Sequence, residues 1–237
     1  SLGTSCARPL CNKHQPIHYC LLRGLEGDKV ILKLDKHTSG GNYIPVTIQV
    51  KRVKSSLLLE YQCDLPTRNL RCTKGDGCPK YGARPCCPPK APLFSHLKTR
   101  RFVYLVMVQI RTEDYIAMRP SMPENKKIYF TMGGIKIISG KLVNKIVNQF
   151  EGQKFKSSGC GGCQYSKTGK CKDFQPMLEG LGINVVELTK DVFDFDIQWF
   201  IKGSRALPDI ITGVGGIYTD EVIPKSKFKE VIENVCR

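Results

Sequence analysis

The sequence has no long hydrophobic run. Its apolar stretches, of which residues 102–108 are an example, are far too short to span a bilayer, so we expect no membrane-spanning segment. The chain also lacks a basic start followed by an apolar segment, so we expect no signal peptide, and no internal repeat or low-complexity linker stands out. These absences favour a globular cytoplasmic protein.

Motifs for common enzyme chemistry are lacking as well. No Ser/His/Asp arrangement is apparent. Residues 213–216 are rich in glycine, but they lack the lysine of a phosphate-binding loop and the strand–helix context of a dinucleotide fingerprint. We interpret this stretch as a tight turn before Tyr218. The sequence therefore assigns no reaction to the chain.

Acidic residues are few relative to basic ones, with 21 Asp and Glu against 37 Lys and Arg and a formal net charge of +16. Such a surface attracts nucleic acid, acidic proteins or anionic small molecules, and it is equally consistent with a surface solvated by lysine. No basic run has aromatic residues interleaved, as a stacking platform for nucleic acid would. Charge alone makes nucleic acid a candidate partner without selecting it.

Cysteine, by contrast, is abundant, and most of the 12 cysteines are clustered. Clustered spacing, the missing export signal and a chain long enough to bury a core favour metal or cluster binding in a reducing compartment over a disulfide framework. A downstream C-x2-C-x7-C array has glycines around its first thiol, and an upstream array ends in a vicinal pair followed by two prolines. The array residues are Cys72, Cys78, Cys86 and Cys87 upstream, and Cys160, Cys163 and Cys171 downstream.

Residues 1–28 form an arm with further candidate ligands. Thiolates and an imidazole can together complete a tetrahedral zinc site. The candidate zinc ligands of the arm are Cys6, Cys11, His14 and Cys20. Their spacing matches no finger pattern, so an irregular arm with free thiols is the alternative, and the arm's thiols could also complete a cluster held elsewhere.

The alternation of strand and helix patterns predicts an α+β fold with an α/β-like C-terminal part. We expect a cysteine-bearing arm and a small antiparallel sheet in residues 1–62, followed in residues 63–237 by an alternating strand/helix domain that carries both cysteine-rich loops. Strands are expected at 30–34, 44–53, 57–61, 101–110, 183–188 and 199–201, and helices at 141–150, 176–181 and 224–236. Ser139 and Gly152 are expected to cap the first of these helices, and Gly182 to end the second.

The two arrays resemble a known family. The upstream part contains Cys78-Pro79-Lys80-Tyr81-Gly82 and Cys87-Pro88-Pro89, and the downstream part contains the Cys160 array followed by residues 176–185, Pro-Met-Leu-Glu-Gly-Leu-Gly-Ile-Asn-Val. Over roughly residues 72–200 this is similar to an uncharacterised family of cysteine-rich predicted metal-binding proteins of archaea and anaerobic bacteria. The chain departs from the family pattern in the five residues between Cys72 and Cys78, and in having a cysteine at position 86. The resemblance implies iron–sulfur binding in an anaerobic or archaeal setting and implies no reaction.

A [4Fe–4S] cluster takes up to four thiolates, and each array offers three. The candidate cluster ligands are Cys72, Cys78 and Cys87 in one array and Cys160, Cys163 and Cys171 in the other, for one cluster or two. Cys63, Cys86 or a thiol of the arm could close the fourth iron, or that iron could stay open. The resemblance favours iron–sulfur over zinc, which spacing alone leaves as an equal alternative.

Three functions are consistent with these ligands. The leading hypothesis is an iron–sulfur protein that acts in electron transfer or as an accessory subunit of an anaerobic redox enzyme, with a protein partner in a redox or assembly complex. A second is an enzyme whose open iron takes part in sulfur transfer. A third, suggested by the basic composition, is a zinc-stabilised module that binds nucleic acid or supports assembly.

Overall fold

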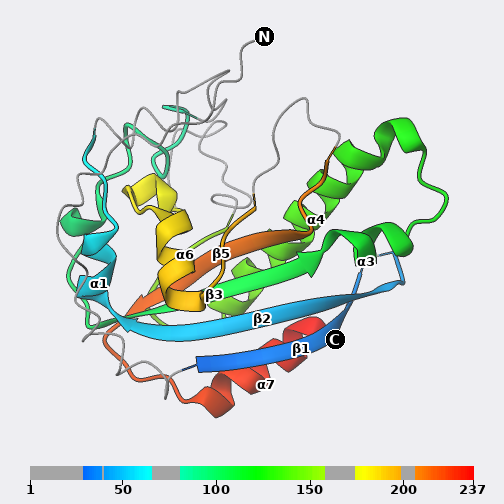
Figure 1. The fold of residues 1–237 in the computed structure, drawn as a ribbon. Coiled ribbons are helices and arrows are strands. Elements are labelled where there is room, and N and C mark those ends of the chain that lie inside the picture. The colour runs from blue at the N-terminus through cyan, green and yellow to red at the C-terminus, as the bar shows by residue number, and fades with distance from the viewer. Residues whose placement is uncertain (1–28, 39, 66–80, 158–173, 199–205) are drawn as a thin grey trace, which may run out of the picture.

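A computed structural model describes residues 29–38, 40–65, 81–157, 174–198 and 206–237. These residues form the predicted α+β fold, in which five strands make one antiparallel sheet in the order β1-β2-β3-β5-β4 (Figure 1). The strands are β1 (Lys29–His37), β2 (Tyr43–Lys54), β3 (Phe102–Arg111), β4 (Gln153–Phe155) and β5 (Ile210–Thr219). Strands β2 and β3, which lie on either side of residue 62, are neighbours in this sheet.

Helices pack against both faces of the sheet. They are α1 (Ser55–Glu60), α3 (Thr112–Ala117), α4 (Glu124–Val147), α6 (Val185–Phe193) and α7 (Lys225–Cys236), with short 3-10 helices η3 (Phe94–His96) and η4 (Glu179–Leu181). Helices α4 and α7 cover one face, and α1 and α6 cover the other (Figure 1). Among the helices that the structure describes, none combines the length and apolarity needed to cross a membrane.

The sheet separates two hydrophobic cores, and β3 contributes to both. Tyr104, Val106 and Val108 pack in the core beneath α4 and α7, while the alternate residues Leu105 and Met107 pack in the core beneath α1 and α6. Successive side chains of a strand point to opposite faces, so a strand buried on both sides reads as one continuous apolar run. The predicted buried strand at 101–110 is confirmed for this reason.

Two predicted strands are helices in the structure. Residues 57–61 were expected to be a third strand of the small sheet, but they belong mostly to α1, where Leu58 is buried and Leu59 is half exposed. Residues 183–188 overlap α6, whose buried positions are 185, 188, 189, 192 and 193. That spacing of three and four residues is helical, and it extends beyond the short window that suggested a strand.

The predicted helix at 141–150 is the C-terminal part of a much longer helix. Helix α4 begins at Glu124, so Ser139 is buried inside it and is not a cap. The first half of α4 was not predicted, because it contains two adjacent glycines, Gly133 and Gly134, and glycine is unfavourable in helix interiors. The C-cap of α4 is Asn148, so Gly152, which has a positive φ of 108°, lies beyond the helix end and is not its cap.

The glycine-rich stretch 213–216 is part of strand β5, not a turn. A Cβ atom at Gly215 would lie 2.5 Å from the carbonyl oxygen of Phe155 and 2.6 Å from Val143 of α4, and one at Gly213 would lie 3.0 Å from Ser139. The glycines therefore let α4 and β4 approach the middle of the sheet closely.

The helix predicted at 224–236 is confirmed, whereas the helix predicted at 176–181 is present only as the short 3-10 helix η4. Helix α7 matches the expected helix at 224–236, and Gly182 ends η4 in the left-handed conformation, with φ of 91°. The strand expected at 199–201 lies outside the described residues.

Candidate metal centre

The residues that precede the upstream array are held against residues 182–184. The backbone N–H of Cys63 donates a hydrogen bond to the carbonyl oxygen of Gly182 at 2.8 Å, and that of Asn184 donates to the carbonyl oxygen of Tyr61 at 2.8 Å. Between them, Gln62 and Ile183 form an antiparallel bridge. Cys63 is 2% exposed, so this thiol lies inside the protein beside η4.

The vicinal pair Cys86 and Cys87 lies against the same segment. Both side chains are buried, at 2% and 7% exposed, and they form a small cluster with the ring of Phe174 packed against them. A Cβ atom at Gly180 would lie 2.8 Å from the carbonyl oxygen of Cys86, so only glycine permits this approach. The turn that carries the pair is closed by a 2.7 Å hydrogen bond from the N–H of Gly82 to the carbonyl oxygen of Pro88.

The two sides of the downstream array are joined to each other. Before it, the N–H of Lys156 donates to the carbonyl oxygen of Pro176, which follows the array, at 2.9 Å. The side chain of Asn144 holds the backbone of Ser157 by two hydrogen bonds, accepting from its N–H at 2.9 Å and donating to its carbonyl oxygen at 3.2 Å. Helix α4 thereby fixes the position of Ser157, the last described residue before the downstream array.

A buried lysine reinforces this attachment. Lys156 is 4% exposed, and its ammonium group donates to the side chain of Asn148 and to the carbonyl oxygen of Asn144. Burying a cation is costly unless its donors are satisfied, and these acceptors on α4 contribute to that. Lys156 therefore ties the start of the downstream array to the sheet and to α4.

The described residues place only part of the predicted ligand set. Cys63, Cys86 and Cys87 lie within the described residues, and each contacts the segment formed by residues 174–183 or lies beside it. The other predicted ligands lie outside the described residues: Cys6, Cys11, His14, Cys20, Cys72, Cys78, Cys160, Cys163 and Cys171. Within the described part of the chain, no three His, Cys, Asp or Glu side chains are grouped closely enough to hold a metal ion. The ligand set therefore stays a prediction.

Cys236 shows what a purely structural thiol looks like in this protein. It belongs to α7 and to the core under α4 and α7, and burial raises the pKa of its thiol. Its surroundings are those of an inert core cysteine. Cys63, Cys86 and Cys87 differ from it because they flank the segments that carry the remaining predicted ligands.

A model of a protein family matches residues 65–211, which is more than half of the chain. Its description is predicted metal-binding protein (DUF2284). The chain belongs to this family. The DUF2284 match contains every cysteine of both arrays, and it leaves out Cys63 and the N-terminal arm. Neither a search of curated proteins nor a search of solved structures gave a match.

The DUF2284 match agrees with the resemblance expected for roughly residues 72–200 and extends it slightly at both ends. It supports metal binding as the predicted property of the family. Sequence reasoning did not identify the residues that support the arrays, Asn144, Lys156, Phe174 and Gly180. Only Gly180 carried a signal, as a glycine inside the predicted short helix, and the partners of the others lie in different elements.

Proposed function

We propose that the protein binds a [4Fe–4S] cluster through its cysteine arrays and acts in electron transfer, either alone or as an accessory subunit of a redox enzyme in a reducing compartment. The observation that carries the proposal is the convergence of the described array ends on one segment, residues 174–183. Cys63 bonds to this segment, the Cys86–Cys87 turn packs on it, and the downstream array is joined to it through Lys156.

The cysteine content of this region suits a cluster. Cys87 would serve with Cys72 and Cys78, and the downstream array would supply its own three thiolates. Cys63 and Cys86 are both buried and both adjoin residues 180–182, so either could supply a fourth thiolate. A cluster with four protein thiolates has no open iron and carries electrons, which favours electron transfer over sulfur transfer chemistry.

The surroundings of the vicinal pair fit this role. The ring of Phe174 covers Cys86 and Cys87, and solvent is largely excluded from their side chains. Solvent exposure and hydrogen bonds to the sulfur atoms are among the factors that set the reduction potential of a cluster. When bound, the cluster would supply one-electron redox chemistry, and the protein would contribute the thiolates and their apolar cover.

The metal content of anaerobically purified protein tests the proposal. We expect about four or eight irons per chain with matching sulfide, and an EPR signal after dithionite reduction. Cys87→Ser should lower the iron content, whereas Cys236→Ser, a cysteine of the other core, should leave it unchanged. Zinc without sulfide, or a protein without metal, would contradict the proposal.

A second experiment distinguishes a closed cluster from an open one. If Cys63 or Cys86 supplies the fourth thiolate, then Cys63→Ala or Cys86→Ala should convert the EPR spectrum of the oxidised protein to that of a three-iron cluster. A four-iron cluster that is unchanged in both variants would show that neither thiol is a ligand, and a thiol of the arm or an open iron would then be the alternatives.

A further inference from the structure

A cavity of about 960 Å³ lies between α4, α3 and the end of β1. Helix α4 and the connection from β1 to β2 lie at the same end of the molecule (Figure 1). The cavity is continued past Phe130 and Arg119, which also line a second hollow of about 450 Å³. Together the two hollows form an elongated surface groove, which we call the α4 groove.

The cavity between α4 and β1 carries positive charge without acidic residues to balance it. Lys36, Arg119, Lys141 and Lys145 line it, and no Asp or Glu is among its described lining residues. Burial, followed by the positive charge of the nearby Lys145, lowers the pKa of Lys36. The ammonium group of Lys36 also donates a 3.3 Å hydrogen bond to the carbonyl oxygen of Cys236. A bound anion would relieve the repulsion between Lys36 and Lys145.

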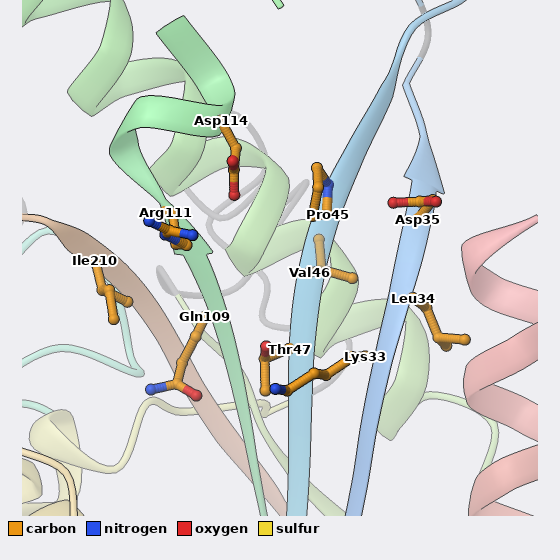
Figure 2. Close-up of a pocket in the computed structure, with 10 residues that line it drawn as sticks. All are labelled: Lys33, Leu34, Asp35, Pro45, Val46, Thr47, Gln109, Arg111, Asp114 and Ile210. Atoms are coloured by element: carbon orange, nitrogen blue, oxygen red, sulfur yellow. The ribbon is translucent and has the colours of Figure 1, made fainter. Parts of the chain in front are cut away.

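Another cavity of the protein shows the contrast. It has a volume of about 470 Å³ and is lined by Lys33 and Arg111 together with Asp35 and Asp114 (Figure 2). Its charges are balanced, so it does not select a ligand of one sign. The uncompensated charge of the α4 groove is therefore a local property and not only a consequence of the basic composition.

Aromatic rings accompany the cations in the α4 groove. Tyr129 is 81% exposed and Phe130 is 46% exposed, and their ring centroids are 6.0 Å apart in an edge-to-face arrangement. The guanidinium of Arg119 lies 4.8 Å from the centroid of the Tyr115 ring. Exposed rings next to cations are the combination with which proteins bind nucleic acid strands, because the bases stack on the rings and the phosphates face the cations.

Gly133 leaves part of the helix surface bare within the groove. A Cβ atom added at this position would have no other atom within 4 Å. One turn of α4 thus presents backbone instead of a side chain, between the aromatic pair and Lys141. A flat base can approach such a surface closely.

We propose that the α4 groove binds single-stranded nucleic acid. Lys141 and Lys145 contact the phosphates, and Tyr129 and Phe130 stack on bases. The exposure of Tyr129 and the continuation of the groove past Phe130 fit a strand that runs along the surface better than an enclosed mononucleotide. None of the described candidate ligands, Cys63, Cys86 and Cys87, is among the residues that line the groove.

Fluorescence anisotropy of the full-length protein with labelled oligouridine and oligothymidine of about eight nucleotides tests this inference. Tyr129→Ala should weaken binding roughly tenfold, because stacking on one base is lost. Gly133→Leu should weaken it comparably by filling the groove. The thermal unfolding midpoint should show that this variant is folded, since no atom lies within 4 Å of the Cβ position at Gly133.

Charge variants test the phosphate contacts. Lys141→Gln should reduce the slope of log affinity against log salt by about 0.7, the value expected for one contact to a single strand. Lys98→Gln removes one charge from an exposed loop before β3, at the opposite end of the sheet, and should leave the slope unchanged.

Three outcomes would overturn the inference. The first is no binding of either oligonucleotide at about 50 mM salt, where phosphate contacts are strong. The second is equal affinity of the wild type and the three groove variants, which would place the strand elsewhere. The third is binding of AMP as tight as that of the oligonucleotides, which would indicate a site for a small nucleotide.

Discussion

Gly133 and Gly134 are neighbours in α4, but their surroundings are opposite. Nothing lies near a Cβ atom added at Gly133, whereas one added at Gly134 would overlap the hydroxyl and ring of Tyr115. Tyr115 is 1% exposed and packs in the core under α4, so it has little freedom to move. Substitutions at these two positions therefore distinguish the effect of helix propensity on stability from the effect of packing.

We expect Gly134→Ala to lower the free energy of unfolding by about 1–3 kcal/mol, because the overlap with Tyr115 outweighs the gain in helix propensity. Gly133→Ala should raise it by about 0.5–1 kcal/mol, because alanine is the better helix former at an open position. Urea denaturation of both variants measures the difference. Equal effects of the two substitutions would show that Tyr115 moves aside freely.

Tyr61 links the segment before Cys63 to α6. Its hydroxyl donates a 2.6 Å hydrogen bond to the carboxylate of Asp191. Burial, followed by this hydrogen bond and the negative charge of Asp191, raises the pKa of Tyr61 above its ordinary value of 10.0. The folded protein thus keeps the proton to higher pH than the unfolded chain does.

The sign of the pH dependence follows from that shift. The stabilisation by Tyr61 is fully present below pH 10, and it is lost above pH 10 because the unfolded chain releases the proton first. We expect the free energy of unfolding of the wild type to fall more steeply than that of Tyr61→Phe, by up to about 1.4 kcal/mol per pH unit. Denaturation from about pH 9 to pH 12 measures this, with the exposed Tyr43→Phe as the control. Parallel curves for all three proteins would contradict the assignment.

At the scale of the elements, α4 connects the sheet to the downstream array. Its 24 residues pack under β3 and β5, and its polar residue Asn144 bonds to both backbone groups of Ser157. Ser157 is 7% exposed, so its N–H and carbonyl have little access to water if Asn144 is removed. The side of α4 that packs in the core thus also carries Asn144, which fixes the position of Ser157.

Asn144→Ala should lower the free energy of unfolding by about 1–3 kcal/mol, the cost of leaving buried backbone groups unsatisfied. If the downstream array holds a metal as proposed, the variant should also release it faster to a chelator. Gln149→Ala is the matched control, since it removes an exposed amide just beyond the same helix. Normal stability in Asn144→Ala would show that water replaces the asparagine.

For the whole molecule, the core under α4 and α7 implies that the sheet can form without the proposed metal. The core under α4 and α7 contains one described cysteine, Cys236, and the sheet is built from strands outside both arrays. A chain of this size can bury a core without a metal, unlike small domains that fold only with one. The metal should therefore organise only the region around residues 81–91 and 174–184.

Metal removal with a chelator under reducing conditions tests this expectation. We expect the amides of β2, β3 and β5 to keep their protection in hydrogen exchange, and those of residues 81–91 and 174–184 to exchange faster. The far-UV circular dichroism should change little. Loss of protection throughout the sheet would show that the metal is required for the fold as a whole.

The elements that the sequence predicted correctly are those whose pattern is local. β3 is an uninterrupted apolar run, and α7 has a regular apolar stripe that begins after Pro224. Two of the errors occur where a glycine is required by a partner that is distant in the sequence. The glycines of β5 suggested a turn because the sequence does not show that α4 and β4 pack against them. Gly134 made α4 hard to predict because this glycine is required by the close approach of Tyr115. Such glycines are required by tertiary contacts, which cannot be recognised from the neighbouring residues in the sequence.

By itself, the sequence determined the fold class, the thiolate character of the proposed site and the excess of positive charge, because periodicity, cysteine spacing and composition are properties of the chain. Only the tertiary structure decided what lies together. It brings Cys63 and the vicinal pair to one segment, and it gathers lysines of β1 and α4 around the exposed rings of Tyr129 and Phe130 in the α4 groove. The reason is that β1, α3 and α4 are separated along the chain, and packing on one sheet makes them neighbours.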